Sequence, residues 1–405
     1  MTKKKTISRR SMLKTFGMAS VATVGLGCAA ISRQAEAAAP EETRRMYKVY
    51  SNGQIGSMKL KNRFIKAATL TESTNADGRF LPQGLEIYRN WSKGGVAMIE
   101  SGHMSVVPFD YHGITHHPAQ IWDDKHIPYM KELVGAVRSG NKDCKFVAFL
   151  NHLGNHPKLV HGQGVSASNV GWPGQKKVAP KTLNVEEINE TTDAFAAAAV
   201  RAQKAGFDGV ELQGGHHFLL HSFISPQTNK RTDRYGGSTE NRVRIVAEIV
   251  EKIKKKVGPD FPILIKVNSF DGGPGGIELD TFPEVAKAIS KTGIDAMELS
   301  GGNPSVPDIE DPTEQSYHAK YAKKIDVDVP VILTGGNKDI DIMERLYNPG
   351  KIDFFALARP LIRQPDLPNF WISKKNDPEC TCESCNECLR YHVFEGNPFL
   401  TCQLD

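Results

Sequence analysis

The chain has 405 residues, 40% of them apolar, which is enough for one large domain or two ordinary ones. Its formal charge of +5 is concentrated at the N-terminus, because residues 1–37 hold seven basic residues and one acid. That segment therefore carries +6 and the remainder −1. This balance argues against a general affinity of the mature protein for nucleic acid or an anionic membrane surface.

Residues 1–37 have the organisation of an export signal. A cationic start precedes a weakly apolar stretch, and the small residues at 35–37 suit cleavage. SRRSMLK, with its pair Arg9 and Arg10, resembles a twin-arginine signal. The apolar run is short and contains glycine, which disfavours a membrane anchor. We therefore expect export in the folded state, a periplasmic or other extracytoplasmic location, and no stable membrane insertion after cleavage.

Eight apolar segments of strand length follow, and each precedes a helical pattern or a long loop. The strand segments are residues 63–69, 96–101, 145–151, 209–213, 263–268, 296–300, 330–335 and 354–358. The helical patterns include residues 85–92, 127–138, 185–205, 238–257, 281–291, 315–324 and 340–347. These repeated units predict an α/β fold, a (β/α)8 TIM barrel in a single domain over residues 46–370. An open doubly wound sheet is the alternative, but no GxGxxG motif follows the first strand.

Functional residues of such a barrel lie at the carboxyl ends of its strands. Glycine pairs follow the sixth and seventh strands, and Arg359 follows the eighth. Backbone N–H groups beside one guanidinium are suited to binding a phosphate. The loop of residues 152–183, rich in Gly, Pro and Lys, is long enough to cover a site.

Several of these segments together resemble the Old Yellow Enzyme family of FMN-dependent oxidoreductases, from about Met46 to Leu367. The likeness is carried by LKNRFIKAAT (60–69), YRNWSKGGVAMIESG (88–102), LNHLG (150–154), SPQTNKRTDRYGGSTENR (225–242), LTGGN (333–337) and ALARPLIRQPDLP (356–368). The motif SPxxNxRxDxYGGSxENR is long and specific. The resemblance implies a TIM barrel that binds FMN across its strand ends.

The resemblance also implies roles for individual residues. Lys266 would place a cation near the N1–C2 edge of the flavin and stabilise its reduced form. The residues expected to lie against the isoalloxazine are Ala67, Ala68, Thr69 and Gly102. The residues expected to bind the phosphate are Gly336, Ala358 and Arg359.

The chain departs from the family pattern where the fourth strand ends. The family has a pair of His, or His and Asn, that binds a carbonyl oxygen of the substrate, and then a proton-donating Tyr. Here the pair is Gln213 and His216, and Phe218 replaces the Tyr. Phe149 stands where the family has a flavin-binding Gln. We expect both Phe residues to serve core packing, with FMN retained through its other contacts.

Loss of the Tyr leaves the proton source open among His216, His217, a loop tyrosine such as Tyr111, and solvent. We expect Gln213 and His216 to bind the oxygen of the acceptor.

Five of the seven cysteines fall in a tail over residues 377–405. Its core resembles the iron–sulfur motif of the dienoyl-CoA reductase and trimethylamine dehydrogenase branch. The expected ligands are Cys382, Cys385, Cys388 and Cys402, with Cys380 left over. A [4Fe–4S] cluster is the main interpretation, and zinc, disulfides or no metal remain alternatives.

These features predict an exported FMN-dependent oxidoreductase that reduces an alkene conjugated to a carbonyl, or a similar small-molecule acceptor. One alternative is an amine-type dehydrogenase that passes electrons from FMN to a cluster. Another is a flavin-free barrel that acts as a binding protein. Because no dinucleotide fingerprint is visible, a redox protein is expected as electron donor, and the oligomeric state stays open.

Overall fold

The computed structural model describes residues 47–404 except 72, 109–118, 157–159, 161, 173–177, 303–308, 310–311, 374–378, 396 and 398. The expected export signal and Tyr111 lie outside the described residues. Residues 44–405 form one compact unit, so barrel and tail belong together. Among the described residues, no helix has both the length and the apolar character needed to cross a membrane.

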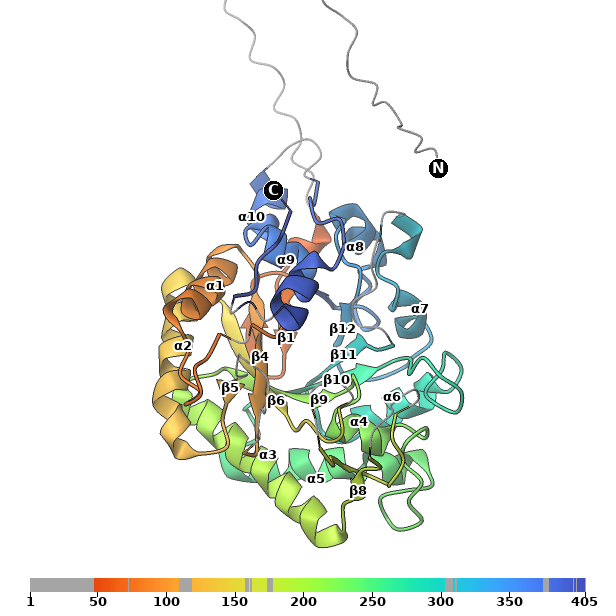
Figure 1. Ribbon diagram of the computed structural model, residues 1–405. Helices are drawn as coiled ribbons and strands as arrows, with labels where there is room; N and C mark the ends of the chain where they lie inside the picture. Colours follow the sequence, from red (N-terminus) through yellow and green to blue (C-terminus); the bar gives the residue numbers. More distant parts are fainter. Residues whose placement is uncertain are drawn as a thin grey trace, which may run out of the picture. The chain divides into compact units, whose positions relative to one another are not determined.

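Eight parallel strands form a closed barrel (Figure 1). They are β3 (Phe64–Lys66), β4 (Met98–Ser105), β6 (Lys145–Asn151), β9 (Gly209–Gly214), β10 (Ile263–Asn268), β11 (Ala296–Ser300), β12 (Val331–Thr334) and β13 (Phe354–Leu357). Strand β13 pairs with β3, and β3 pairs with β4, which closes the sheet. All eight predicted strands and the TIM barrel are confirmed, and the open sheet is wrong.

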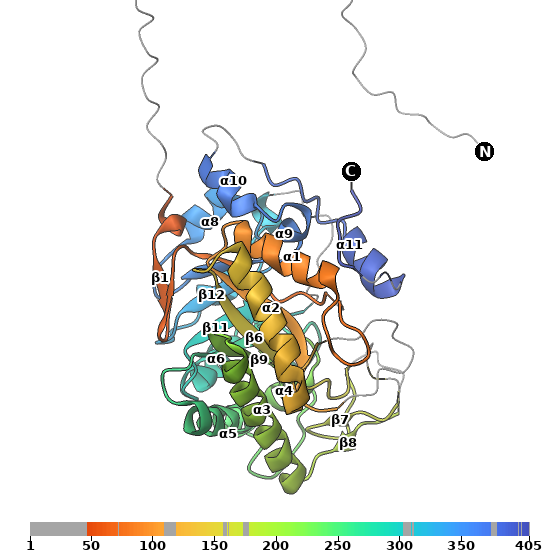
Figure 2. The ribbon, with the colours of Figure 1, turned by 90° about the vertical axis from the view of Figure 1, so that its left-hand side faces the viewer.

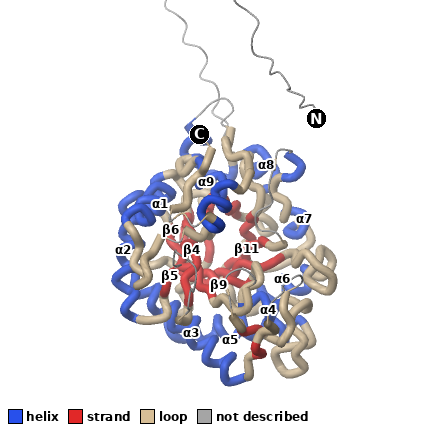
Figure 3. Tube along the Cα trace, viewed as in Figure 1, coloured by secondary structure: helices blue, strands red, loops and turns tan. Residues whose placement is uncertain are grey.

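Helices surround the strands (Figure 3). They are α1 (Pro82–Lys93), α2 (Ile127–Gly140), α3 (Val185–Ala205), α4 (Leu219–Ile224), α5 (Thr239–Val257), α6 (Phe282–Ser290), α7 (Ala319–Ala322), α8 (Ile340–Leu346), α9 (Arg359–Arg363), α10 (Leu367–Ser373) and α11 (Glu387–Leu389). Short 3-10 turns are η1 (Lys48–Tyr50), η2 (Asp124–His126) and η3 (Pro312–Glu314), and a π-helical turn, η4, covers Arg390–Phe394. Figure 2 shows α1, α2 and α3 in a row along one side of the barrel.

Local sequence explains where these helices begin and end. Asn184 and Glu187 form a capping box at the start of α3, and Gly206 ends it at φ 95°. The helix expected over residues 315–324 is shortened to α7, because Ser316 has a left-handed φ of 51° and interrupts the helical path. Because position 316 is a serine and not a glycine, this break in the helix could not be predicted from the sequence.

Two apolar cores stabilise the barrel. A large one lies between strands and helices, and a smaller one fills the barrel interior with residues such as Met98, Leu264 and Ala296. A hairpin of β1 (Gly53–Ile55) and β2 (Met58–Leu60) packs against this interior core. The remaining strands are the two-residue segments β5 (Ala119–Gln120), β7 (Val165–Ser166) and β8 (Lys181–Thr182).

Candidate active site

The side chains inside the barrel form layers, because alternate residues of a strand point to the same face. In β10 and β11 the interior apolar residues Leu264 and Ala296 are followed two positions later by Lys266 and Glu298. Asn268 and Ser300 follow two positions later again, where the strands end. A charged layer therefore lies between the apolar core and the strand ends that carry the expected site.

The charged layer is a buried cluster of three carboxylates around one lysine. Lys266 Nζ lies 2.7 Å from an oxygen of Glu100 and 3.2 Å from one of Glu298. The third carboxylate, Glu211, is 3.6 Å from the same nitrogen. The carboxylates are fully buried, and Lys266 is 4% exposed. The cation expected at the fifth strand is therefore present and held by ion pairs.

Burial and the ion pairs shift the pKa values of this cluster in different directions. Burial disfavours the charge of Lys266, but the surrounding carboxylates outweigh it and raise its pKa. Burial favours the neutral form of Glu100 as well, but the positive charge of Lys266 outweighs burial, so the pKa of Glu100 is lowered. Burial and the neighbouring Glu100 raise the pKa of Glu211 well above its usual range, and raise that of Glu298 to about 8.

The chain turns sharply at His216 and His217, directly after β9. Both residues have left-handed backbone angles, with φ of 51° and 69°. Two adjacent left-handed residues that are not glycine are strained, so the surrounding contacts must hold them. The strain marks this turn as a functional part of the fold rather than a simple loop.

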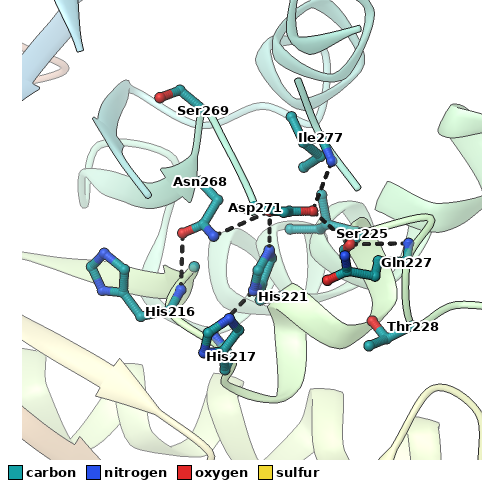
Figure 4. A network of polar contacts seen from close by, with 12 residues as sticks. His216, His217, His221, Ser225, Gln227, Thr228, Asn268, Ser269, Asp271 and Ile277 are labelled. Carbon is teal, nitrogen blue, oxygen red and sulfur yellow. Dashed lines mark hydrogen bonds and ion pairs between the residues drawn. The ribbon is translucent and has the colours of Figure 1, made fainter. Parts of the chain in front are cut away.

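A polar network centred on Asp271 holds the turn (Figure 4). The His217 N–H donates to His221 Nδ1 at 3.0 Å, and His221 Nε2 donates to Asp271 at 2.7 Å. The His216 N–H donates to Asn268 at 3.0 Å, and the Asn268 amide donates to the same Asp271 oxygen at 3.1 Å. Both left-handed residues are thus tied to one buried carboxylate.

Further contacts stabilise that carboxylate and the turn. The second oxygen of Asp271 accepts bonds from the Ser225 hydroxyl at 2.6 Å and the Ile277 N–H at 2.8 Å. Burial opposes the charge, but His221 and these donors lower the pKa of Asp271 to about 2. Trp172 stacks on His221 and donates its indole N–H to the His217 carbonyl at 3.0 Å.

Gln213 and His216 meet at the barrel mouth as the sequence predicts. The Gln213 amide nitrogen lies 3.5 Å from His216 Nδ1, and His216 Nε2 lies 2.8 Å from the Ser300 hydroxyl. Burial and the charge of Lys266 lower the pKa of His216 well below its usual range. The imidazole is therefore neutral, and with Nδ1 facing the Gln213 amide, its Nε2–H is the donor.

Phe149 and Phe218, which stand where the family pattern has Gln and Tyr, pack in the wall of the barrel mouth. Phe149 is 2% exposed, and Lys266 Nζ lies 4.5 Å from the centre of its ring. Phe218 is 3% exposed between the rings of His103 and His156, whose centres lie 4.8 and 4.6 Å away. Both side chains are packed, in line with the core role expected for them.

Neighbouring protein groups approach the glycines at the strand ends too closely for a side chain to fit there. A Cβ at Gly102 would lie 2.9 Å from the Thr69 carbonyl oxygen. A Cβ at Gly335 or Gly336 would lie 2.6 or 3.0 Å from the ring of Tyr317, and both glycines have positive φ. Bare backbone at these ends, together with the Lys266 cation, fits a flat anionic cofactor such as FMN.

The remaining expected flavin contacts lie at the first and last strands. The Ala68 N–H donates to Glu100 at 2.7 Å, which connects this segment to the ion cluster. Ala67 is buried, and the Thr69 hydroxyl is 2.5 Å from Lys66 Nζ. Ala358 directly precedes α9. Their flavin contacts remain predictions.

Arg359, expected at the phosphate, also contacts the cysteine-rich tail. Its guanidinium donates to the Ser384 carbonyl at 2.9 Å and to the Asn386 side chain at 2.8 Å. Two other cations reach the tail, since Lys338 lies 3.5 Å from the Cys382 carbonyl and Arg363 lies 3.8 Å from Cys402 Sγ. The tail is thus fixed beside the last barrel strand by positive side chains.

The described cysteines Cys144, Cys380, Cys382, Cys385, Cys388 and Cys402 are free thiols. Among the described residues, no three cysteine sulfurs lie within 4.8 Å of one another. A tetrahedral zinc site has Zn–S bonds of about 2.3 Å, so its sulfurs lie about 3.8 Å apart. The described cysteines therefore do not form the closed arrangement of a zinc site, and their role stays a prediction.

Comparison with known proteins gives the family. Residues 49–376 match the NADH:flavin oxidoreductase / NADH oxidase family. The chain belongs to this family. Membership of this flavin oxidoreductase family favours an enzyme that binds FMN over the flavin-free alternative.

Individual relatives are larger proteins. The NADH oxidase of Thermoanaerobacter brockii is 32% identical over 86% of this chain and 54% of its own length. A 2-naphthoyl-CoA reductase complex is similar with a TM-score of 0.78 and 26% identity, over 88% of this chain and 57% of that one. Histamine dehydrogenase from Rhizobium sp. 4-9 is similar with a TM-score of 0.68 and 27% identity, over 80% of this chain and 47% of that one. The chain spans about half the length of these relatives.

The sequence interpretation of this Old Yellow Enzyme member missed two groups. It overlooked the carboxylates that surround Lys266, although each lies inside an apolar strand, in MIES, VELQ and MELS. An acid in the middle of a buried strand is a usable signal, because buried charges are paired. It also missed Asp271, which follows β10 in a loop with no distinctive pattern.

Proposed function

We propose that this flavoenzyme reduces a small acceptor in which an alkene is conjugated to a carbonyl. The arrangement of Gln213 and His216 carries the proposal, because the two side chains lie against each other at the barrel mouth and Gln213 is in register with Lys266 on the neighbouring strand. A carbonyl oxygen placed there would accept bonds from both side chains. FMN, when bound, supplies hydride transfer.

The residues of the chain would orient the acceptor and stabilise charge. His216 is neutral and donates from Nε2, which faces the Ser300 hydroxyl, so an acceptor oxygen would replace or join that partner. Lys266 would offset negative charge on the reduced cofactor, and the carboxylates keep this lysine charged.

An amine-type dehydrogenase is the second proposal, supported by the likeness to histamine dehydrogenase. In that case electrons would leave through the cysteine-rich tail, where Arg359 and Lys338 contact carbonyl oxygens and Arg363 contacts the Cys402 sulfur. We further propose that the tail carries a [4Fe–4S] cluster on Cys382, Cys385, Cys388 and Cys402. A redox protein would exchange electrons with that cluster, and the protein would act after export through the twin-arginine route.

Anaerobic stopped-flow spectroscopy separates the two enzyme proposals. The bound flavin is first reduced chemically and mixed with enones, and the oxidised flavin is mixed with primary and tertiary amines in a second series. Reoxidation by enones with no bleaching by amines supports the reductase. Bleaching by amines alone supports the dehydrogenase. Purified folded protein that shows no flavin absorption and takes up no added FMN would contradict both.

A further inference from the structure

The buried cluster around Lys266 contains more negative than positive groups. Three carboxylates, Glu100, Glu211 and Glu298, each place an oxygen within 4.8 Å of the other two. Lys266 is the cation among them. If all three acids were ionised, the cluster would carry a net charge of −2 in the barrel interior. Such an excess is very costly without solvent, so protons must bind to the cluster.

Lys66 does not balance the excess negative charge of the three carboxylates. It lies outside the interior layer, where its ammonium donates to the Ala67 carbonyl at 2.7 Å and lies 4.1 Å from the centre of the Trp91 ring. Burial lowers the pKa of Lys66 to about 7, so its own charge is only partly retained at neutral pH. His103 and His216 face the cluster from the mouth, but burial and Lys266 lower the pKa of both imidazoles and keep them neutral.

Hydrogen bonds rank the three acids by their ability to hold a charge. Glu100 accepts from Lys266 and from the Ala68 N–H, both at 2.7 Å. Glu298 accepts a bond from the Thr334 hydroxyl and pairs with Lys266 at 3.2 Å. Neither oxygen of Glu211 accepts a bond from an N–H or hydroxyl group; its carboxyl meets that of Glu298, and Lys266 is farther from it than from the other two acids.

We propose that Glu100, Glu211 and Glu298 form a buried proton-binding site. Glu100 is the ionised member, Glu211 is a carboxylic acid, and Glu298 exchanges its proton in response to the charge of the group bound above Lys266. The raised pKa of Glu298, about 8, places this exchange near the working range. The part that concerns bound charge rests on the proposed flavin function, whereas the neutral state of Glu211 does not.

Negative charge on the reduced cofactor would raise the proton affinity of the cluster through Lys266, the cation that the two share. A proton taken up by Glu298 would then restore the charge balance without displacing the lysine. Reduction would thereby be coupled to proton uptake at a group that touches neither solvent nor substrate.

Infrared spectroscopy of full-length protein labelled with ¹³C at the glutamate carboxyl groups tests the neutral acid. At about pH 10, where Glu298 with its pKa of about 8 is ionised, we expect an isotope-shifted C=O band of a protonated carboxylic acid that moves in D2O and is lost in Glu211→Gln. Glu251→Gln, an exposed residue of α5, is the matched control and should retain the band. Absence of the band in the wild-type protein, or its persistence in folded Glu211→Gln, overturns the proposal whether or not flavin is bound.

The second measurement is the midpoint potential of the bound flavin as a function of pH. We expect the dependence in the wild-type protein to be steeper around pH 8 than in Glu298→Gln, by up to about one proton per flavin. If the potential depends on pH equally in the wild-type protein and in Glu298→Gln, the proposed proton exchange by Glu298 is wrong. If the protein binds no flavin, the proposed function fails, and the infrared result still decides the state of Glu211.

Discussion

His221 Nε2 lies 2.7 Å from Asp271 Oδ1, and both side chains are completely shielded from solvent. Through its other nitrogen, His221 accepts the backbone N–H of His217. A buried carboxylate thus determines, through one imidazole, the path of the chain at the strained turn that presents His216. Asp271 is a positioning residue in this arrangement, since it acts through His221 and Asn268.

The substitution Asp271→Asn should destabilise the protein by about 2–4 kcal/mol at neutral pH. The new amide would direct N–H groups at the Ser225 hydroxyl and the Ile277 N–H, which now donate to the carboxylate. Denaturant unfolding with Asp260→Asn, an exposed control, measures the difference. Equal stability of the two variants would show that the network contributes little.

The same carboxylate gives a pH dependence with a defined sign. The pKa of Asp271 falls from 3.8 to about 2 on folding, so its contribution is complete above pH 3.8 and is lost as the pH falls toward 2. The loss amounts to about 2 kcal/mol. Unfolding curves over this interval should show the decline in the wild-type protein but not in Asp271→Asn.

We expect the variant His217→Gly to be more stable than His217→Ala by about 1 kcal/mol, because φ at this position is 69° and only Gly adopts this region without strain. Both variants lose the ring contact with Trp172, so their difference isolates the backbone. At Glu251, in the helical interior of α5, the order should be reversed, with Ala more stable. Chemical denaturation measures the free energy of unfolding of the four variants. If the Ala variant is more stable than the Gly variant at both positions, the backbone at His217 is not strained.

Lys66 should make the protein more stable as the pH rises. Its pKa falls from 10.5 to about 7 on folding, because burial disfavours the charge. The unfolded chain therefore binds more protons between these values, and stability increases across the interval by up to about 5 kcal/mol. Lys66→Met should abolish the increase, whereas Lys255→Met, at an exposed site, should retain it. The same pH dependence of stability from pH 7 to 10 in the wild-type protein and in Lys66→Met contradicts the assignment.

The cysteine tail gives a prediction about metal content. Cys382→Ser should lose iron in anaerobically purified protein, because the motif assigns this thiol as a ligand. Cys380→Ser is the control, since Cys380 precedes the motif, and should retain iron and its visible absorption. Zinc at one equivalent without iron in the wild-type protein would contradict the electron-transfer role of the tail.

Export can be tested by changing Arg9 and Arg10 together to Lys. The charge stays the same, but a twin-arginine receptor reads the guanidinium pair, so the protein should accumulate in the cytoplasm. Lys4→Arg, in the same cationic segment, should be exported normally. Cell fractionation with immunoblotting provides the measurement, and export of the double variant would exclude this route.

The barrel could be predicted from sequence because its strands are continuous apolar runs of the right length between helical patterns. The predicted strand at 296–300 matches β11 at both ends. The helix expected over 315–324 was wrong in extent, since tertiary contacts hold Ser316 in a left-handed conformation that its residue type disfavours. Local propensity carries no information about such an override.

The site was predicted in part. Gln213 and His216 meet as expected, because they are only three positions apart at the end of one strand. The environment of Lys266 could not be predicted, since its partners come from three other strands and become neighbours only when the barrel closes. The network of Asp271 depends likewise on a contact between helix α4 and the loop after β10, which are distant in sequence.

Closure of the barrel also determines when the protein can acquire its cofactor. The first barrel strand, β3, obtains its second neighbour from β13, whose last residue is Leu357. During synthesis the sheet therefore stays open until almost the whole barrel has left the ribosome, and the last expected phosphate contacts, Ala358 and Arg359, emerge immediately afterwards. We therefore expect cofactor loading to be a late event that follows synthesis of the barrel, and it would have to precede the proposed export in the folded state.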